Sequence, residues 1–411
     1  MLTQRVVITG RGAVSPYGVG VEALVEGIWA GRSAVQRMEA WRGLGGLRSL
    51  LAAPVPEYDA KKAISRHLRR NMGPMAVNSA VASLEAVAEA GLSEAFLQSG
   101  DVGVALGSTT GSPGIWEQLY TTLLRERSID SIKSGEFFKI MGNSCAANVM
   151  FTLGLKGEQW GPSSACTSSA QAIGLGYLLV KSGRQKAVLC GGAEEVHQSV
   201  TTIFDVLGAT SCRNDEPGET PRPFDRDRDG VVCGGGAGVL VLESLESALE
   251  RGAAIEAELI GFGHVSDPGH IAHPDPEAMG AAMRAALREA RVDAADVDYV
   301  NAHATGTPQG DVAEAHAIAA VLGGDVPVSS LKGHIGHTLG AAGVLESVLA
   351  LEMLRRQELV PTLHLESPDP ECEVVHLLRR PARDRIDTVL KNNFAMGGVN
   401  VALVFRKWQG G

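Results

Sequence analysis

The chain has 411 residues, which suits one large α/β unit or two to three domains of average size. Hydrophobic residues make up 45% and charged residues 20%, ordinary values for a globular protein with a large core. A net charge of −10 argues against nucleic acid as the main partner, and no apolar run reaches the about 18 residues that cross a bilayer. We therefore expect a cytoplasmic protein that binds neither nucleic acid nor membrane.

Strand-like apolar runs alternate with helical patterns along the chain. The strand-like runs cover residues 5–8, 101–106, 187–190, 238–242, 297–300 and 326–330. Helical patterns cover residues 75–90, 277–290 and a stretch around 345–353. This alternation predicts an α/β protein with parallel sheets covered by helices. A weak two-fold repeat, with a charged seam near residues 243–255, predicts halves at residues 1–250 and 251–411.

Small residues surround Cys166, which lies where a helix is predicted to begin. The apolar pattern that follows recurs every three or four residues and stops at residues 181–183. A thiol at a helix N-terminus meets unpaired N–H groups and the positive end of the dipole, which favour the thiolate. Cys166 is therefore a candidate nucleophile, although most free cysteines are simply small buried residues. The other five cysteines show no zinc spacing and indicate reduced core or loop positions.

Two histidine motifs each follow a strand-like run. Residues 301–311 (NAHATGTPQGD) place His303 at a strand end, and residues 332–343 (KGHIGHTLGAAG) contain His334 and His337. Active sites of α/β proteins collect at strand ends. From the residues alone, His303 could equally be a core histidine, and His334 competes with His337. Three further histidines lie among aspartates and prolines and indicate a loop, not a metal site: His264, His270 and His273.

In this order and at these separations, the motifs resemble those of the elongating (types I and II) β-ketoacyl-acyl-carrier-protein synthases, the condensing enzymes of fatty acid synthesis. Matching segments also occur at residues 223–230, 234–238 and 393–400. The resemblance implies the thiolase fold, with two similar halves in five αβαβα layers and the catalytic groups between them. It implies decarboxylative condensation of an acyl group held on a cysteine with malonyl-acyl carrier protein. No metal is implied, and no cofactor beyond the carrier's phosphopantetheine arm.

The resemblance also implies roles for individual residues. Cys166, His303 and His337 would form the catalytic triad, with Lys332 as a further catalytic residue in contact with the structural Glu314. The backbone N–H groups of Cys166 and Met396 would form the oxyanion hole. The implied substrate-binding residues are Thr305, Thr307, Phe204, Val231 and Met396.

The chain departs from the family's pattern at the acyl pocket. Met396 stands where the usual motif has a second phenylalanine that gates the pocket, and Val231 replaces a further aromatic residue. A thioether is narrower and more flexible than a phenyl ring, so we expect a looser gate. These changes point to a specialised acyl substrate and leave the condensation chemistry untouched.

A basic cluster stands out in this acidic chain. It consists of Lys61, Lys62, Arg66, His67, Arg69 and Arg70. Such a run is usually only a solvated helix face. Acyl carrier proteins are strongly acidic, however, and the family's docking residues correspond to Arg66, His67 and Arg70, with Lys139 added to the set. The expected partners are an acyl carrier protein and a second chain, in a homodimer or a heterodimer with a related protein.

Most alternative functions would require a different residue at one of these positions. A thiolase would need a second catalytic cysteine at Met396, and an initiating synthase would carry asparagine at His337. A non-catalytic partner subunit would lack the cysteine at position 166. A condensing enzyme of polyene or polyketide synthesis would share every motif and remains open.

Overall fold

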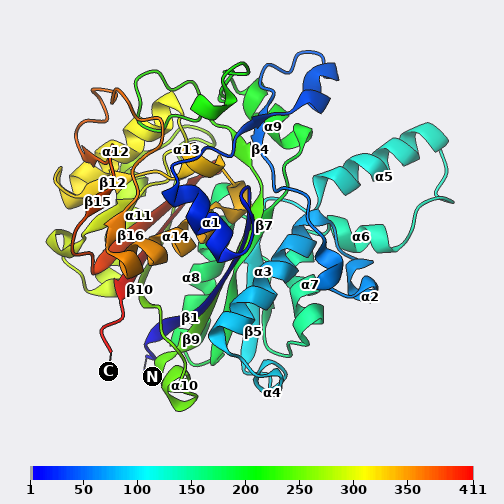
Figure 1. Cartoon of the computed structure of the whole chain (residues 1–411), viewed down its shortest axis with the longest axis horizontal. Coiled ribbons are helices and arrows are strands. Elements are labelled where there is room, and N and C mark those ends of the chain that lie inside the picture. Colours follow the sequence, from blue (N-terminus) through cyan, green and yellow to red (C-terminus); the bar gives the residue numbers. More distant parts are fainter. Residues whose placement is uncertain (1–2, 411) are drawn as a thin grey trace.

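The computed structural model describes residues 3–410, which fold around one large mixed sheet (Figure 1). Its first half contains β1 (Val6–Ser15), β2 (Gly18–Val19), β5 (Val102–Gly107), β6 (Gln159–Trp160), β7 (Ala187–Glu194) and β9 (Gly236–Ser244). Its second half contains β10 (Ala257–Ser266), β11 (Tyr299–Asn301), β12 (Pro327–Ser329), β14 (His376–Leu377), β16 (Thr388–Ala395) and β17 (Val399–Lys407). The strand order is β14-β12-β11-β16-β17-β10-β1-β9-β7-β5-β6, with β2 beside β1.

Helices cover both faces of each half. In the first half of the chain they are α1 (Val21–Trp29), α2 (Arg66–Arg69), α3 (Pro74–Ala90), α4 (Glu94–Leu97), α5 (Pro113–Glu126), α6 (Gly135–Ile140), α7 (Ser144–Leu153), α8 (Ser168–Lys181), α9 (Gln198–Val206) and α10 (Leu245–Glu250). The second half contributes α11 (Pro276–Ala290), α12 (Pro308–Leu322), α13 (Lys332–Ile335) and α14 (Ala342–Arg356). Two small sheets pair β3 (Gln36–Arg37), β4 (Leu51–Ala53) and β8 (Cys233–Gly234), and β13 (Glu358–Leu359) with β15 (Ala382–Arg383).

The sheet is mixed, which corrects the expectation of parallel sheets. Pairs β5–β7 and β11–β16 are parallel, whereas β7–β9, β9–β1, β16–β17 and β17–β10 are antiparallel. A strand buried on both faces reads as a continuous apolar run whichever way it points, so the sequence pattern carried no information on direction.

The two halves repeat the same arrangement, and a pair of glycines makes the correspondence concrete. In the first half, a Cβ on Gly12 of β1 would lie 1.9 Å from the carbonyl oxygen of Ala82 on α3. In the second half, a Cβ on Gly263 of β10 would lie 2.0 Å from the carbonyl oxygen of Ala282 on α11. Each outer helix therefore lies directly on its strand, and only glycine permits this approach.

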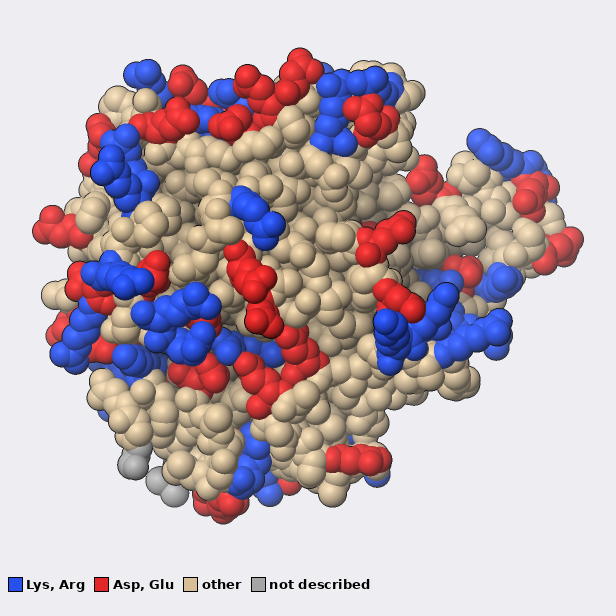
Figure 2. All heavy atoms as spheres, viewed as in Figure 1, with Lys and Arg blue, Asp and Glu red and all other residues tan. Residues whose placement is uncertain are grey.

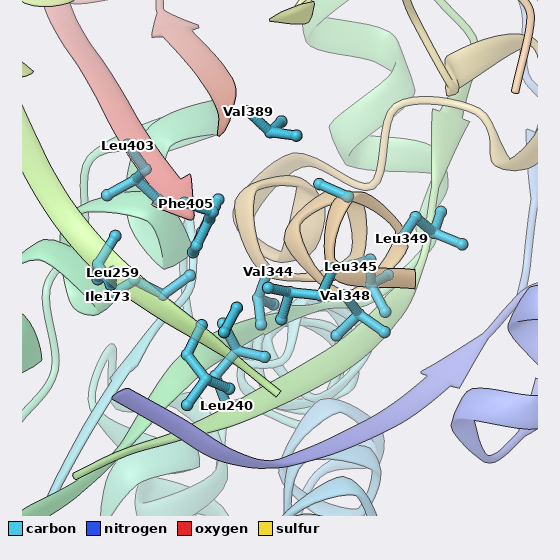
Figure 3. Close-up of a cluster of buried hydrophobic side chains, with 14 of the residues drawn as sticks. Ile173, Leu240, Leu259, Val344, Leu345, Val348, Leu349, Val389, Leu403 and Phe405 are labelled. Atoms are coloured by element: carbon cyan, nitrogen blue, oxygen red, sulfur yellow. The ribbon is translucent and has the colours of Figure 1, made fainter. Parts of the chain in front are cut away.

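The central layer consists of α8 and α14, which pack against each other and against both halves of the sheet. Figure 3 shows α14 end-on, with its apolar side chains directed at those of β9, β10 and β17. Almost every side chain of α14 is buried, as expected for a helix enclosed by two sheets. With α3 and α7 outside one half and α11 and α12 outside the other, the layers run αβαβα.

Helices α5 and α6 project from one side of the molecule (Figure 1). The projection and the segment within it expose large apolar side chains: Tyr120, Leu124, Ile129, Phe137 and Phe138. Among residues 3–410, no helix has the length and apolar character needed to cross a membrane.

Candidate active site

Cys166 lies in a short 3-10 turn, Ala165–Thr167, immediately before α8. The turn is sharp because Ala165 has a φ of 48°, in the left-handed region that a residue with a side chain rarely adopts. Strained residues of this kind cluster at functional sites. The cysteine itself is only 6% exposed. The predicted helix is therefore present, but Cys166 precedes its first turn.

The two histidines come from the second half of the chain. His303 follows β11 and opens the loop that leads into α12, while His337 follows α13 and precedes α14. The backbone of His337 is tied to the strand-like segment before β8, since its N–H donates to the carbonyl oxygen of Val232 at 2.7 Å. His303 thus lies at the carboxyl end of a strand, as predicted, and His337 lies after the short helix α13 that follows β12.

The structure brings the three residues together. One ligand atom each of Cys166, His303 and His337 lie within 4.8 Å of one another. The imidazole rings of the histidines stand at 83° with centroids 5.1 Å apart. Thiolate sulfur and imidazole nitrogen are also ligands for zinc. Among the described residues, this is the one cluster of three such groups. The same set equally suits a nucleophile facing two hydrogen-bond donors.

A cavity of about 520 Å³ opens onto this triad. All of the sequence-predicted substrate residues line it: Phe204, Val231, Thr305, Thr307 and Met396. The hydroxyl oxygens of Thr305 and Thr307 lie 3.1 Å apart on one wall. The cavity therefore combines a polar side near the histidine loop with an apolar side near α9.

The Nδ1 atom of each catalytic imidazole accepts a hydrogen bond. The N–H of Leu339 donates to Nδ1 of His337 at 3.3 Å, and the side-chain amide of Asn393 donates to Nδ1 of His303 at 3.4 Å. A neutral imidazole that accepts at Nδ1 carries its proton on Nε2. The Nε2 of His337 is buried and has no partner within the described part of the chain. It is therefore a donor without an acceptor, as a site that awaits a substrate oxygen would provide.

Both imidazoles are neutral. Burial lowers the pKa of His303 and of His337 well below 6.5, and the positive charges of Lys332 and Lys391 lower both further. Neutral rings donate one N–H each and are not general acids at physiological pH. This electrostatic environment suits stabilisation of a developing negative charge.

The thiol of Cys166 differs from expectation. Burial raises its pKa to about 12, and Lys332 acts in the opposite direction without compensating. The helix N-terminus was predicted to favour the thiolate, but Cys166 lies before the first turn of α8 and is shielded from water. Desolvation of the charged form therefore dominates.

Lys332 and Glu314 do not pair as expected. The Nζ of Lys332 lies 2.5 Å from Oε1 of Glu346 on α14, and Lys332 does not line the cavity. Glu314 instead accepts the backbone N–H groups of His303 at 2.8 Å and Ala304 at 2.7 Å. Burial raises the pKa of Glu314 to about 7. Glu314 thus holds the histidine loop directly, and Lys332 acts as a buried charge behind it.

A second set of polar contacts secures the same loop. The Asp311 carboxylate accepts the N–H groups of Thr305 at 3.0 Å and Gly306 at 3.1 Å. Arg228 donates to the carbonyl oxygens of Thr307 at 3.2 Å and Pro308 at 2.7 Å. Arg228 belongs to the matching segment 223–230, and it secures the histidine loop through these contacts.

The remaining histidines differ in whether they line the cavity. His334 is buried with Nδ1 3.3 Å from the carbonyl oxygen of Arg32 and does not line the cavity, whereas His337 does. His270 and His273 stack at a centroid distance of 3.9 Å and line the cavity mouth, a position that the sequence did not suggest. Their loop is attached to the Met396 turn, because the N–H of Gly397 donates to the carbonyl oxygen of Ile271 at 2.8 Å.

The basic cluster occupies α2 and its flanks, outside the cavity lining. Figure 2 shows blue side chains gathered on the side where Figure 1 places α2. Arg66, His67 and Arg70 are exposed, whereas Lys139 is ion-paired with Glu136 at 3.1 Å and only 17% exposed. Lys139 is therefore the least available of the four residues for docking.

Two family models match the chain in tandem. The N-terminal domain of β-ketoacyl synthase matches residues 3–248, and the C-terminal domain matches residues 256–366. The chain belongs to the β-ketoacyl synthase family. A 3-oxoacyl-[acyl-carrier-protein] synthase 2 of Synechocystis is 34% identical over 412 residues, 99% of each chain. A 3-oxoacyl-[acyl-carrier-protein] synthase 1 of Escherichia coli K12 is 34% identical over 98% of this chain and 99% of its own.

Solved structures place the fold in the same family. A β-ketoacyl synthase from Burkholderia phymatum has a TM-score of 0.96 at 42% identity, covering 99% of this chain and 100% of its own. The ishigamide ketosynthase/chain length factor has a TM-score of 0.93 at 30% identity, and AntDE:AntF, a polyketide ketosynthase with its acyl-carrier protein, has 0.88 at 30%. Both cover 99% of this chain and 100% of their own. The thiolase-type fold expected from the resemblance is confirmed.

Proposed function

We propose that this β-ketoacyl synthase joins an acyl group held on Cys166 to a malonyl unit delivered by acyl carrier protein, with loss of CO₂. One observation carries the proposal above all: a buried thiol faces two neutral imidazoles whose acceptor contacts at Nδ1 leave Nε2–H free to donate. The substrates arrive on the phosphopantetheine arm of the carrier, and Thr305 and Thr307 on the polar wall are suited to hold that arm.

In the loading step, the Sγ of Cys166 attacks the acyl thioester carbonyl. A carbon–sulfur bond forms to Cys166, and the bond to the pantetheine sulfur breaks. The proton lost by Cys166 goes to the departing pantetheine thiolate. The backbone N–H groups of Cys166 and Met396 stabilise the oxyanion, and the tight turn at Met396–Gly398 is suited to present one of them.

In the condensation step, malonyl carrier loses CO₂ and leaves an enolate. The Nε2–H groups of His303 and His337 donate to the enolate oxygen, so the negative charge develops where donors are already in place. The enolate carbon then attacks the acyl-Cys166 carbonyl. The new carbon–carbon bond forms as the carbon–sulfur bond breaks, and the sulfur of Cys166 leaves as a thiolate that takes a proton from water.

Mass spectrometry of the protein after incubation with acyl carrier tests the proposal. We expect the acyl mass on the peptide that contains Cys166, none in Cys166→Ala, and retention of malonyl decarboxylation in that variant because both histidines remain. Cys233→Ala is the matched control, since Cys233 is a buried thiol packed in the same cluster. An acyl group on any of the other five cysteines would overturn the assignment.

We also propose that the chain works as a dimer, with the apolar projection of α5 and α6 covered by a second ketosynthase-type chain. Large apolar side chains gathered on one exposed projection favour an interaction site. The ketosynthase/chain length factor relative supports a heterodimer as the alternative to a homodimer. We place the boundary between the two halves of the chain near residue 250, at the connection between α10 and β10. All six cysteines are free thiols, which fits a reducing, cytoplasmic location.

A second candidate substrate class is favoured by the acyl side of the cavity. Met396 and Val231 lie where the family's pattern predicts bulkier aromatic residues, and Val231 is buried in the lining. This supports a condensing enzyme of polyene or polyketide synthesis that accepts bulkier or stiffer chains by the same chemistry. Loading competition between saturated and polyenoyl carriers of equal length distinguishes the two: a preference for saturated chains favours fatty acid elongation.

A further inference from the structure

One fully buried lysine has no role in the two steps above. Lys391 lies in the middle of β16, between strands β11 and β17, and its side chain is 0% exposed. Lysines are almost never fully buried unless they are paired. Its ammonium lies 2.7 Å from Oε2 of Glu346 and also donates to the carbonyl oxygen of Asn392.

Glu346 is shared by two lysines. Its Oε1 lies 2.5 Å from Nζ of Lys332, its Oε2 lies 2.7 Å from Nζ of Lys391, and the carboxylate is 1% exposed. The two ammonium groups share this one carboxylate, and the further carboxyl group that acts on Lys391 is Glu314, whose pKa burial raises to about 7. A buried ion group of this kind is weak grounds for stability, because desolvation offsets the attraction between its members. The arrangement calls for a role other than stability.

Lys391 is joined to the histidines through its own strand. Side chains alternate along β16, so Lys391 and Asn393 face one side, where Asn393 donates to Nδ1 of His303 at 3.4 Å. Asn392 faces the other side and donates to Oε1 of Glu314 at 3.2 Å, and Glu314 holds the backbone of His303. The same short stretch of strand therefore supports His303 from both faces and carries the buried charge.

We propose that Lys391 is a positioning residue for the histidine pair: together with Lys332 it shares Glu346, and its ammonium charge adds to the burial that keeps His303 and His337 neutral and favours an anionic oxygen between their Nε2–H groups. This inference rests on the proposed condensation. It adds a residue that acts through the histidines and does not itself touch the substrate.

The electrostatics around Lys391 agree with the geometry. The ionisable groups that act on it or on its partner Glu346 are Glu346 from α14, Lys332 from α13, Glu314 from α12 and Tyr299 from β11, and His303 and His337 are the groups on which it acts. Burial and the charge of Lys332 lower the pKa of Lys391 to about 8, against the opposing effect of Glu346 and Glu314. Its charge is therefore present below about pH 8 and is lost as the pH rises through that value.

The first test is the pH dependence of condensation by wild-type enzyme already acylated on Cys166, so that the cysteine ionisation plays no part. We expect a basic limb near pH 8, as Lys391 loses its proton. A profile that stays flat from pH 7 to 9 would overturn the proposal without any variant. Failure of the wild type to condense at all would instead count against the proposed function.

The second test compares Lys391→Gln and Lys391→Met with wild type. We expect condensation at pH 7 to fall roughly tenfold, the basic limb near pH 8 to disappear, and acyl loading on Cys166 to change little. Lys186→Met is the matched control, because Lys186 forms an exposed ion pair with Asp101 at 2.9 Å. Equal losses in loading and condensation with an unchanged pH profile would mean that Lys391 only supports the fold.

The third measurement does not need activity. NMR titration of ¹³C-labelled histidines reports the pKa of His303 and His337 in wild type and in Lys391→Gln, with Lys186→Met as control. Removing a positive charge stabilises imidazolium, so both pKa values are expected to rise in Lys391→Gln. Unchanged histidine titrations in a folded variant would refute the electrostatic part of the proposal even if condensation cannot be assayed.

Discussion

The ring of His303 stands at 83° to the ring of His337, with their centroids 5.1 Å apart. Because the rings are nearly perpendicular and both accept at Nδ1, their Nε2–H groups can converge on one oxygen without stacking against each other. Such a pair serves a single anionic oxygen well. It is poorly suited to accept a proton from Cys166, since each facing nitrogen already carries one.

The histidine pair is therefore expected to act after loading. His303→Ala or His337→Ala should reduce condensation roughly 100- to 1,000-fold if each removes one oxyanion donor, while acylation of Cys166 suffers less. Pre-steady-state loading measured apart from condensation separates the steps. His334→Gln is the control, because His334 is buried nearby but does not line the cavity. Equal loss of both steps would contradict this division.

Cys166 is expected to be a protonated thiol at neutral pH that reacts through a small thiolate fraction. Because burial raises its pKa to about 12, the thiolate fraction should grow about tenfold per pH unit between pH 6 and 9. Alkylation of Cys166 by iodoacetamide should rise in the same proportion, with Cys166→Ala giving the background from the other thiols. A plateau between pH 7 and 8 would show that the helix N-terminus, and not burial, controls this thiol.

Met396 is expected to widen the range of acyl groups admitted. Its side chain is 37% exposed on the cavity wall, and an unbranched thioether adjusts through several torsions where a phenyl ring must rotate as a unit. Met396→Phe should exclude bulkier or stiffer chains and leave short saturated ones nearly unaffected, since the backbone N–H remains. Acyl-enzyme yields across a series of chain lengths measure this. An identical profile would remove the side chain from the selectivity argument.

The basic cluster is expected to recruit the carrier. Arg66→Glu with Arg70→Glu should raise KM for carrier-bound substrates and leave activity on small thioesters nearly unchanged. Added salt should mimic the double variant, because exposed charges are screened over about 8–10 Å. Lys139→Gln should matter less, since Lys139 is ion-paired with Glu136. A double variant that binds carrier as tightly as wild type would place docking elsewhere.

The sequence by itself determined the candidate triad and several of the helices and strands around it. Local signals made Cys166 and the two histidine motifs candidates, and the resemblance to the β-ketoacyl synthases selected His303 and His337 from the histidines that competed with them. The helix expected at residues 75–90 is α3 (Pro74–Ala90), and that at 277–290 is α11 (Pro276–Ala290). Apolar periodicity is a local property, so it survives without knowledge of the fold.

Only the tertiary structure decided which charges pair and how the thiol ionises. Lys332 pairs with Glu346 and not with Glu314. Lys332 and Glu346 are fourteen residues apart in sequence, and the packing of α13 on α14 brings them to 2.5 Å. Lys391 reads in sequence as the first of three consecutive polar residues in a strand, yet it shares the same carboxylate. The pKa of Cys166 depends on burial by both halves. Pairing and desolvation arise from contacts between distant segments, and no local pattern encodes them.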